Sequence, residues 1–132
     1  GFGIKHLVHS IERAMIDSLA RHGIEAQARE DAPGVYLHSG AKIGQIGMRV
    51  RQSCTFHGLS LNVDMDLEPF SRINPCGHVG MAVTDMAAEG VSVTWQSMGE
   101  QVVSALCQLL SCEADYRRGM PAELCSESCV QV

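Results

Sequence analysis

One short run of the sequence holds a thiol in a tight turn, where covalent chemistry could take place. In Asn74-Pro75-Cys76-Gly77 the proline keeps the preceding residue extended, and the glycine lets the chain turn sharply after the thiol. A thiol held in this way is exposed, and the backbone N–H groups of Cys76 and Gly77 could face an oxyanion. The alternative is a small buried cysteine, because free cysteine is among the most buried residue types.

Lys42 is the candidate for activating this thiol. An ordinary thiol, with a pKa of about 8.5, is only a few per cent thiolate at pH 7, so a nucleophilic cysteine needs a nearby cation or base. An ammonium group within about 4–6 Å would stabilise the thiolate. Lys42 follows a predicted hairpin turn, in a strand that also carries Gly44 and Gly47. The alternative is a lysine with a solvated head at a strand edge, and the spacing alone does not show that Lys42 meets Cys76.

Two histidines compete as the base and also allow a metal-site interpretation. Cys54-x-x-His57 and Cys76-x-His78 together offer four residues of types that bind zinc. Their separations match no common zinc pattern, so we expect neither a metal nor a cofactor and keep a zinc-binding structural domain as an alternative. The other four cysteines belong to a final helix and a polar tail and carry a weaker pattern: Cys107, Cys112, Cys125 and Cys129.

The composition excludes several classes of function. Apolar residues make up 45 % and charged residues 19 % of the 132 residues, which is typical of one globular domain. A net charge of −5 argues against a nucleic-acid binder, and 5 % aromatic residues argue against base stacking. No apolar run is long enough to span a membrane. We therefore expect a cytoplasmic monomer with reduced cysteines, and the first residue, Gly1, suggests a piece of a longer protein.

Hydrophobic periodicity predicts an α+β fold, a mostly antiparallel or mixed sheet backed by helices. Apolar residues at helical spacing predict a first helix that buries Ile4, Leu7, Val8, Ile11, Met15 and Leu19. Strands are expected at residues 24–29, 35–37, 41–50 and 56–63, and an irregular loop at 64–76. A capping box, Ser97-x-x-Glu100, marks the start of a last helix that ends near residue 110. Residues 1–112 are expected to form the domain, and residues 113–132 a polar, flexible tail.

Five ordered blocks between residues 31 and 77 resemble the lipoyl(octanoyl) transferase family. They are Asp31-Ala32-Pro33-Gly34-Val35-Tyr36, Lys42-Ile43 followed by Gly47, Phe56-His57-Gly58-Leu59, Asn62-Val63, and Ile73-Asn74-Pro75-Cys76-Gly77. The resemblance implies the α+β fold of biotin and lipoate protein ligases. The family's N-terminal part, with an Arg-Gly-Gly run and a His-Gly-Pro-Gly run, has no counterpart here, so the fold is expected to be incomplete at its N-terminus.

The resemblance also implies an activity and its partners. Members of the family move an octanoyl group from octanoyl-acyl carrier protein to a lysine of lipoyl domains, an early step of protein lipoylation. These domains belong to 2-oxoacid dehydrogenase complexes and to the glycine-cleavage H protein. By position, Cys76 matches the acyl-thioester cysteine and Lys42 the lysine that activates it. Two segments match the substrate-lining parts, Gln45, Ile46 and Gly47 with Gly58, Leu59 and Ser60, and three residues are possible supporting groups, His57, Asn74 and Gly77.

The chain departs from the family pattern in its substrate-lining segments. Small residues are usual in the family where this chain has Gln45 and Ser60, which affects the expected acyl-chain preference. Two further functions stay open as alternatives: a non-catalytic fragment that binds an acyl group or its carrier, and a relative of the ATP-dependent lipoate ligases.

Because acyl carriers are acidic, we also expect Arg49, Arg51 or Arg72 to form a local positive patch.

Overall fold

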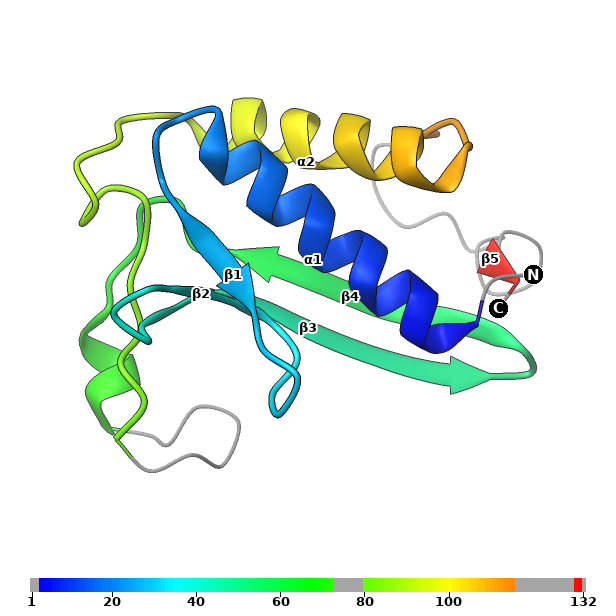
Figure 1. The fold of residues 1–132 in the computed structure, drawn as a ribbon, viewed down its shortest axis with the longest axis horizontal. Helices are drawn as coiled ribbons and strands as arrows, with labels where there is room; N and C mark the ends of the chain where they lie inside the picture. The colour runs from blue at the N-terminus through cyan, green and yellow to red at the C-terminus, as the bar shows by residue number, and fades with distance from the viewer. Residues whose placement is uncertain (1–2, 73–79, 116–129, 132) are drawn as a thin grey trace.

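The chain forms one antiparallel sheet with two helices packed on one of its faces (Figure 1). A computed structural model describes residues 3–72, 80–115 and 130–131. The sheet contains five strands in the order β1-β2-β3-β4-β5, and neighbouring strands run antiparallel. The elements are α1 (Ile4–Ala20), β1 (Ala26–Ala28), β2 (Val35–Leu37), β3 (Lys42–Arg51), β4 (Cys54–Leu61), the 3₁₀-helix η1 (Glu68–Arg72), α2 (Trp95–Leu110) and β5 (Val130–Gln131). Among the described residues, no helix is both long and apolar enough to cross a membrane.

The first helix buries most of the face that its periodicity predicts. Leu7, Ile11, Met15 and Leu19 lie in the core, whereas Ile4 at the start of the helix remains 43 % exposed. The core forms between α1, α2 and the strands because each helix offers one apolar stripe that needs a partner surface. The predicted first helix is therefore confirmed, apart from Ile4, which is exposed, and Val8, which is only partly buried.

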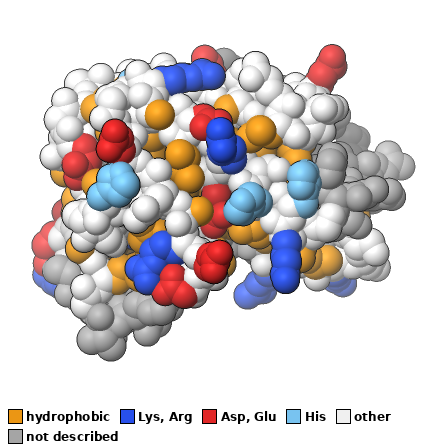
Figure 2. All heavy atoms as spheres, in the orientation of Figure 1, with side chains coloured by type: hydrophobic (Ala, Val, Ile, Leu, Met, Phe, Trp, Pro, Cys, Tyr) orange, Lys and Arg blue, Asp and Glu red, His pale blue; other side chains and the backbone are white. Residues whose placement is uncertain are grey.

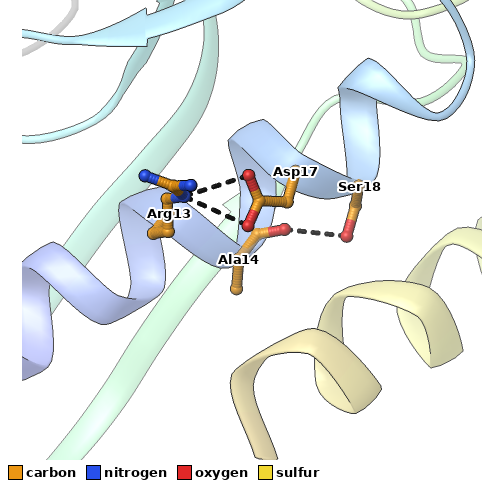
Figure 3. Close-up of polar contacts among 4 residues, drawn as sticks. All are labelled: Arg13, Ala14, Asp17 and Ser18. Atoms are coloured by element: carbon orange, nitrogen blue, oxygen red, sulfur yellow. Dashed lines mark hydrogen bonds and ion pairs between the residues drawn. The ribbon is translucent and has the colours of Figure 1, made fainter. Parts of the chain in front are cut away.

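Two polar side chains of α1, Arg13 and Ser18, form hydrogen bonds within the helix (Figure 3). The Arg13 Nε group donates to both carboxylate oxygens of Asp17, at 3.0 and 3.1 Å. The hydroxyl of Ser18 is fully buried and donates to the Ala14 carbonyl at 2.7 Å. Buried serine is tolerated here because its donor is satisfied, and the small Ala14 and Ser18 side chains allow close packing on this face.

The strands follow the predicted order with shifted ends. The first is limited to Ala26–Ala28, and the fourth runs over Cys54–Leu61 where residues 56–63 were expected. The predicted hairpin between β2 and β3 is confirmed, and Gly40 adopts φ +88 in its turn. The expected irregular loop contains η1, because Asp66 Oδ1 accepts the Glu68 N–H at 3.0 Å and Pro69 is well suited to a first helical turn.

Thr94 caps the second helix, so the predicted capping box is wrong. The backbone of Thr94 is extended, and its hydroxyl oxygen accepts the Ser97 N–H at 3.2 Å. Ser97 is therefore the third residue of α2 and not its cap. Both hydroxyl residues precede the same apolar pattern, and Ser97 with Glu100 matches the capping-box signature by sequence alone.

The capping assignment predicts different outcomes for two alanine substitutions. Thr94→Ala should lower the free energy of unfolding by about 1 kcal/mol, since it removes the acceptor for an orphan N–H. Ser97→Ala and Glu100→Ala should each change it by less than about 0.5 kcal/mol. Urea unfolding of the three variants checks this, and equal losses for Thr94→Ala and Ser97→Ala would contradict it.

Of the three arginines expected in a positive patch, only Arg49 and Arg51 belong to the same element, β3. Arg49 and Arg51 lie near the end of β3 that turns into β4, whereas Arg72 ends η1 at the opposite end of the sheet (Figure 1). Arg72 also pairs with Glu68 at 2.7 Å. Figure 2 shows basic and acidic side chains interspersed over the face that it displays. A patch for an acidic carrier would therefore have to form around Arg49 and Arg51.

Candidate functional site

Lys42, the predicted activating residue, is buried in the structure. Lys42 is only 1 % exposed, which excludes a solvated lysine at a strand edge. Its Nζ group donates to the Pro33 carbonyl at 3.3 Å and lies 5.4 Å from the centroid of the Tyr36 ring. A buried ammonium group needs such partners because the loss of hydration is costly. The chain therefore holds this amine in a fixed place.

A β-bulge decides which face of the sheet Lys42 points to. Val35 pairs with Gly44 and Tyr36 pairs with Lys42, so Ile43 is an extra residue between the two pairs. Residues paired across strands share a face, whereas Val35 and Tyr36 are adjacent and face opposite sides. Lys42 therefore faces away from Gly44. In a regular strand the two would share a face, and the bulge reverses that relation.

The two faces of the sheet can be told apart at Gly44. A Cβ atom at Gly44 would lie 3.0 Å from the Met15 sulfur, so this face is covered by α1. Ile46 follows on the same face by alternation and packs against the core. Lys42 therefore lies on the other face, which we call the open face because neither helix covers it.

The turn at residues 31–34 forms a wall against the Lys42 side chain. Gly34 has φ +137, and a Cβ atom there would lie 2.8 Å from Lys42 Cε and 2.8 Å from the Gly44 carbonyl oxygen. The Gly34 N–H donates at 3.2 Å to Oε1 of Glu12, a buried carboxylate on α1. Glycine is needed at position 34 for two reasons: its backbone has a positive φ, and the Lys42 side chain leaves no room for a Cβ atom.

The backbone of Lys42 is also held by the segment that follows the predicted nucleophile loop. The Lys42 N–H donates to the Ala82 carbonyl at 2.8 Å, and the Thr84 N–H donates to the Lys42 carbonyl at 2.9 Å. Lys42 and Val83 thus form a parallel bridge. Asn62 adds a side-chain bond to the Thr84 carbonyl at 2.9 Å. The chain returns to Lys42 shortly after residue 79.

The two predicted substrate-lining segments lie directly opposite each other on β3 and β4. Their pairs are Gln45 with Ser60, Ile46 with Leu59, and Gly47 with Gly58. By alternation, the first and third pairs lie on the open face with Lys42, and the second faces the helices. The hydroxyl of Ser60 donates to Gln45 Oε1 at 2.7 Å. A Cβ atom at Gly47 or at Gly58 would meet nothing within 4 Å, so bare backbone is accessible there.

Several predicted residues cannot be placed beside Lys42. Cys76, Asn74, Gly77 and His78 lie outside the described residues, and of His57 only its position in β4 is described. The expected contact between the thiol and Lys42 stays a prediction, and so does the zinc alternative, which needs Cys76 and His78.

Cys107 is a poor substitute for the predicted nucleophile. Cys107 lies within α2, and Cys112 follows the left-handed Ser111 that ends the helix, as expected. Partial burial raises the pKa of the Cys107 thiol, and a hydrogen bond with Cys112 raises it further. A raised pKa leaves less thiolate at neutral pH, so Cys107 is less reactive than an ordinary thiol.

Sequence reasoning missed three groups that hold Lys42. Pro33 supplies a carbonyl, Glu12 fixes the turn, and Tyr36 lies beside the amine. The Tyr36 hydroxyl is buried and has no hydrogen-bond partner in the part of the chain that the structure describes. The predicted hairpin could have indicated that Tyr36 lies near Lys42, since the strands on either side of its turn must pair. Glu12 gave no such signal.

The arrangement of the helices and strands matches a known fold. A candidate lipoate protein ligase from T. acidophilum, solved with bound lipoic acid, matches 86 % of this chain and 48 % of its own length with a TM-score of 0.58. The sequence identity is 14 %, so this likeness concerns the fold alone. It confirms the predicted α+β architecture of lipoate protein ligases.

The family follows from the sequence. Residues 1–107 match the lipoyl protein ligase A/B catalytic domain, and the chain belongs to this family. An octanoyltransferase from Pseudomonas fluorescens (strain Pf0-1) is 47 % identical over 110 residues, which cover 83 % of this chain and 51 % of the relative. One from Alcanivorax borkumensis is 51 % identical over 83 % of this chain and 44 % of its own length. The predicted resemblance is confirmed, and the chain spans about half the length of these curated relatives.

Proposed function

We propose that this chain carries the nucleophile and its activating lysine in an octanoyltransferase. The reaction moves an octanoyl group from octanoyl-acyl carrier protein to a lysine of a lipoyl domain, through a thioester on Cys76. The acceptors are lipoyl domains of 2-oxoacid dehydrogenase complexes and the glycine-cleavage H protein. The proposal takes its reaction from the octanoyltransferases that the chain resembles at 47–51 % identity.

The buried amine of Lys42 is the observation that carries the proposal. It is 1 % exposed, bonded to a backbone carbonyl, and directed by a bulge to the same face as the Gln45–Ser60 and Gly47–Gly58 pairs. A lysine kept only for solubility would not need this support. A fixed ammonium group can stabilise a thiolate, and a fixed amine can relay its proton.

The reaction divides into two acyl transfers. First, the Cys76 thiolate attacks the thioester carbonyl of the carrier, the carbon–sulfur bond to the carrier breaks, and the carrier leaves as its thiolate, which takes a proton from solvent. Second, the amine of the acceptor lysine attacks the Cys76 thioester, an amide forms, and the Cys76 thiolate leaves while the amine loses its proton. Lys42 stabilises the thiolate in both steps. A thioester replaces a thioester, so loading needs no ATP.

Chain connectivity is compatible with this pairing. Cys76 precedes residues 82–84, which hydrogen bond to the Lys42 backbone, by only a short stretch of chain. A stretch of this length spans at most about 20 Å even when fully extended. The chain between Cys76 and this segment is therefore short, which supports a position of Cys76 near the activating amine.

Gln45 should limit the length of the acyl chain. Its side chain lies on the open face beside bare glycine backbone and is held by Ser60 at 2.7 Å. Gln45→Ala should raise kcat/KM for decanoyl relative to octanoyl carrier by up to about fourfold per added methylene, since each buried methylene contributes about 0.8 kcal/mol. Ser60→Ala is the control, because it removes the hydrogen bond and little volume. An unchanged substrate ratio in Gln45→Ala would exclude this role.

A chimeric enzyme allows the thioester to be tested in a whole domain. In this chimera the present chain replaces the 110 matched residues of the Pseudomonas fluorescens octanoyltransferase. After mixing with octanoyl carrier, intact-mass measurement should show one octanoyl adduct that Cys76→Ser lacks. Cys107→Ser is the matched control and should keep the adduct. The same adduct in Cys76→Ser would sink the proposal.

The same experiment tests the alternative of a non-catalytic fragment. That alternative predicts carrier binding by the isolated chain and no adduct in either the chain or the chimera.

A further inference from the structure

Two cysteines meet at the C-terminal end of α2, on the side of the sheet opposite the open face. Ser111 ends the helix in a left-handed conformation, with φ 52 and ψ 47. The chain then turns back, and the Cys112 N–H donates to the Cys107 carbonyl at 3.0 Å. This bond closes a Schellman motif, a helix end in which the side chains of the two bonded residues commonly pack together. In this chain both of those residues are cysteines.

The two thiols contact each other directly. Burial raises the pKa of the Cys107 thiol, and its hydrogen bond with Cys112 raises it further. Cys107 therefore keeps its proton and donates it toward the Cys112 sulfur. A disulfide needs Cα atoms about 4.4–6.8 Å apart, and the backbone hydrogen bond already holds the two residues close together. The helix end thus favours a bond between the two sulfurs.

Both cysteines are accessible from one hollow in the surface. The hollow has a volume of about 410 Å³ and is lined by both cysteines together with Val103 and Gln108 of α2. Cys112 is exposed, and Cys107 is half-buried beside it. Accessible thiols are the ones that small oxidants modify, whereas buried thiols are inert. An oxidant can therefore reach Cys112 and leave Cys107 next to the product.

A metal site is a weaker interpretation of this pair. Zinc in proteins is held by at least three side chains, and by four in structural sites. Among the residues that the structure describes, no group of three or more histidine, cysteine or carboxylate side chains could hold a metal ion. Two thiols without a third ligand are better suited to bond with each other.

We propose that Cys107 and Cys112 form an oxidative modification site, at which a hydroperoxide converts the two thiols into a reversible disulfide across the end of α2. Cys112 reacts first because it is the exposed thiol, and Cys107 then resolves the product. The new bond holds the left-handed turn at Ser111 closed. In a reducing compartment such a bond is transient, as redox-sensing disulfides are. The site is separate from the proposed acyl transfer on Cys76.

The reaction moves two electrons from the thiols to the peroxide. Cys112 loses its proton to solvent, its thiolate attacks a peroxide oxygen, and the oxygen–oxygen bond breaks. Hydroxide leaves and takes the proton of Cys107 as water. The Cys107 thiolate then attacks the Cys112 sulfur, a disulfide forms, and the sulfenic oxygen leaves as hydroxide, which takes a proton from solvent. Two thiols and one hydrogen peroxide thus give one disulfide and two waters.

Cleavage after glutamate isolates this pair from the other cysteines. Glu100 and Glu113 bound a fragment, residues 101–113, that contains Cys107 and Cys112 and no other cysteine. The folded chain is treated with hydrogen peroxide, unfolded, blocked with iodoacetamide and cleaved. The fragment should lack two hydrogens and carry no blocked thiol, and dithiothreitol should restore two blocked thiols. Two blocked thiols after peroxide treatment, or a link to a fragment with another cysteine, would overturn the proposal.

The role of the helix end is tested at Ser111. In a glutathione redox buffer, the equilibrium constant for the disulfide should be at least about tenfold larger in the folded chain than in urea, since the fold positions the thiols. Ser111→Gly should keep this advantage because glycine accepts a positive φ, whereas the β-branched Ser111→Val should lose most of it. Circular dichroism verifies that α2 is retained. Equal constants in the two variants, or in the folded and unfolded chains, would contradict the proposal.

The order of the two thiols is tested by trapping the sulfenic acid. In Cys107→Ser the resolving thiol is missing, so the sulfenic acid on Cys112 should persist and react with dimedone. Cys112→Ser is the matched variant, and its fragment should take up several-fold less dimedone because Cys107 is half-buried and has a raised pKa. Equal or stronger labelling in Cys112→Ser would overturn the assigned order. Neither measurement depends on acyl transfer, so these outcomes leave the proposed function untouched.

Discussion

Lys42→Met in the chimeric enzyme should lower the rate of Cys76 acylation by about 10²–10⁴-fold, which is the usual contribution of a positioned acid or base. Methionine fills nearly the same volume and removes the amine that donates to the Pro33 carbonyl. The fold should survive the change, because the Pro33 carbonyl that loses its donor costs only about 1–3 kcal/mol. Single-turnover mass spectrometry measures the rate, and thermal unfolding measures the stability.

The pH dependence of Lys42→Met distinguishes a role of Lys42 in activating the Cys76 thiol from a purely structural role. If Lys42 makes the thiolate available, acylation in Lys42→Met should recover as pH rises through the ordinary thiol range near about 8.5, because hydroxide then supplies the thiolate. The unsubstituted chimera should gain much less over the same range. Lys42→Arg keeps a positive charge and removes the proton relay, so retained activity in it would favour charge stabilisation. A small, pH-independent loss in Lys42→Met would contradict a role in activation.

Gly34→Ala should be the most damaging single-methyl substitution near the site. The new methyl group would lie 2.8 Å from Lys42 Cε and 2.8 Å from the Gly44 carbonyl oxygen, in a backbone with φ +137. We expect a loss of about 2–5 kcal/mol in unfolding free energy, combining backbone strain with overpacking. Displacing the Lys42 amine by about 1 Å could lower acyl transfer by a further 10²-fold.

Gly58→Ala provides the matched control for stability. Gly58 has φ +138, nearly the same as Gly34, but a Cβ atom there meets nothing within 4 Å. It should therefore carry only the backbone strain, of about 1–3 kcal/mol. Urea unfolding of the two variants isolates the crowding against Lys42 and the Gly44 carbonyl as their difference. Equal losses would show that the turn is not crowded at Gly34.

Much of the fold could be predicted because short-range patterns determine it. The buried stripe of α1 follows from apolar residues at helical spacing, and the β2–β3 hairpin follows from its turn residues. The cap of α2 could not be assigned in the same way. Thr94 and Ser97 both satisfy the local rules, and only the extended backbone of Thr94 distinguishes them.

The candidate site residues could be named from the sequence and stay a prediction, whereas the surroundings of the lysine could not be predicted. Lysine near a turn is usually solvated, and the burial of Lys42 arises from elements far apart in the sequence, including Glu12 and the segment around Val83. The bulge at Ile43 is likewise a property of pairing between strands. No feature of the residues 42–44 themselves reveals it.

Because of the bulge at Ile43, the face of the sheet to which the Lys42 amine points depends on the number of residues in β2 and β3. One extra residue between Val35 and Tyr36 would give Ile43 a partner, restore regular alternation and turn the Lys42 side chain toward α1, even though every residue named for the site would still be present. Placing an equivalent lysine on another hairpin would therefore require the extra residue of the bulge as well as the lysine side chain. Among relatives, a length change at this point would be a better sign of lost chemistry than a change of amino acid nearby.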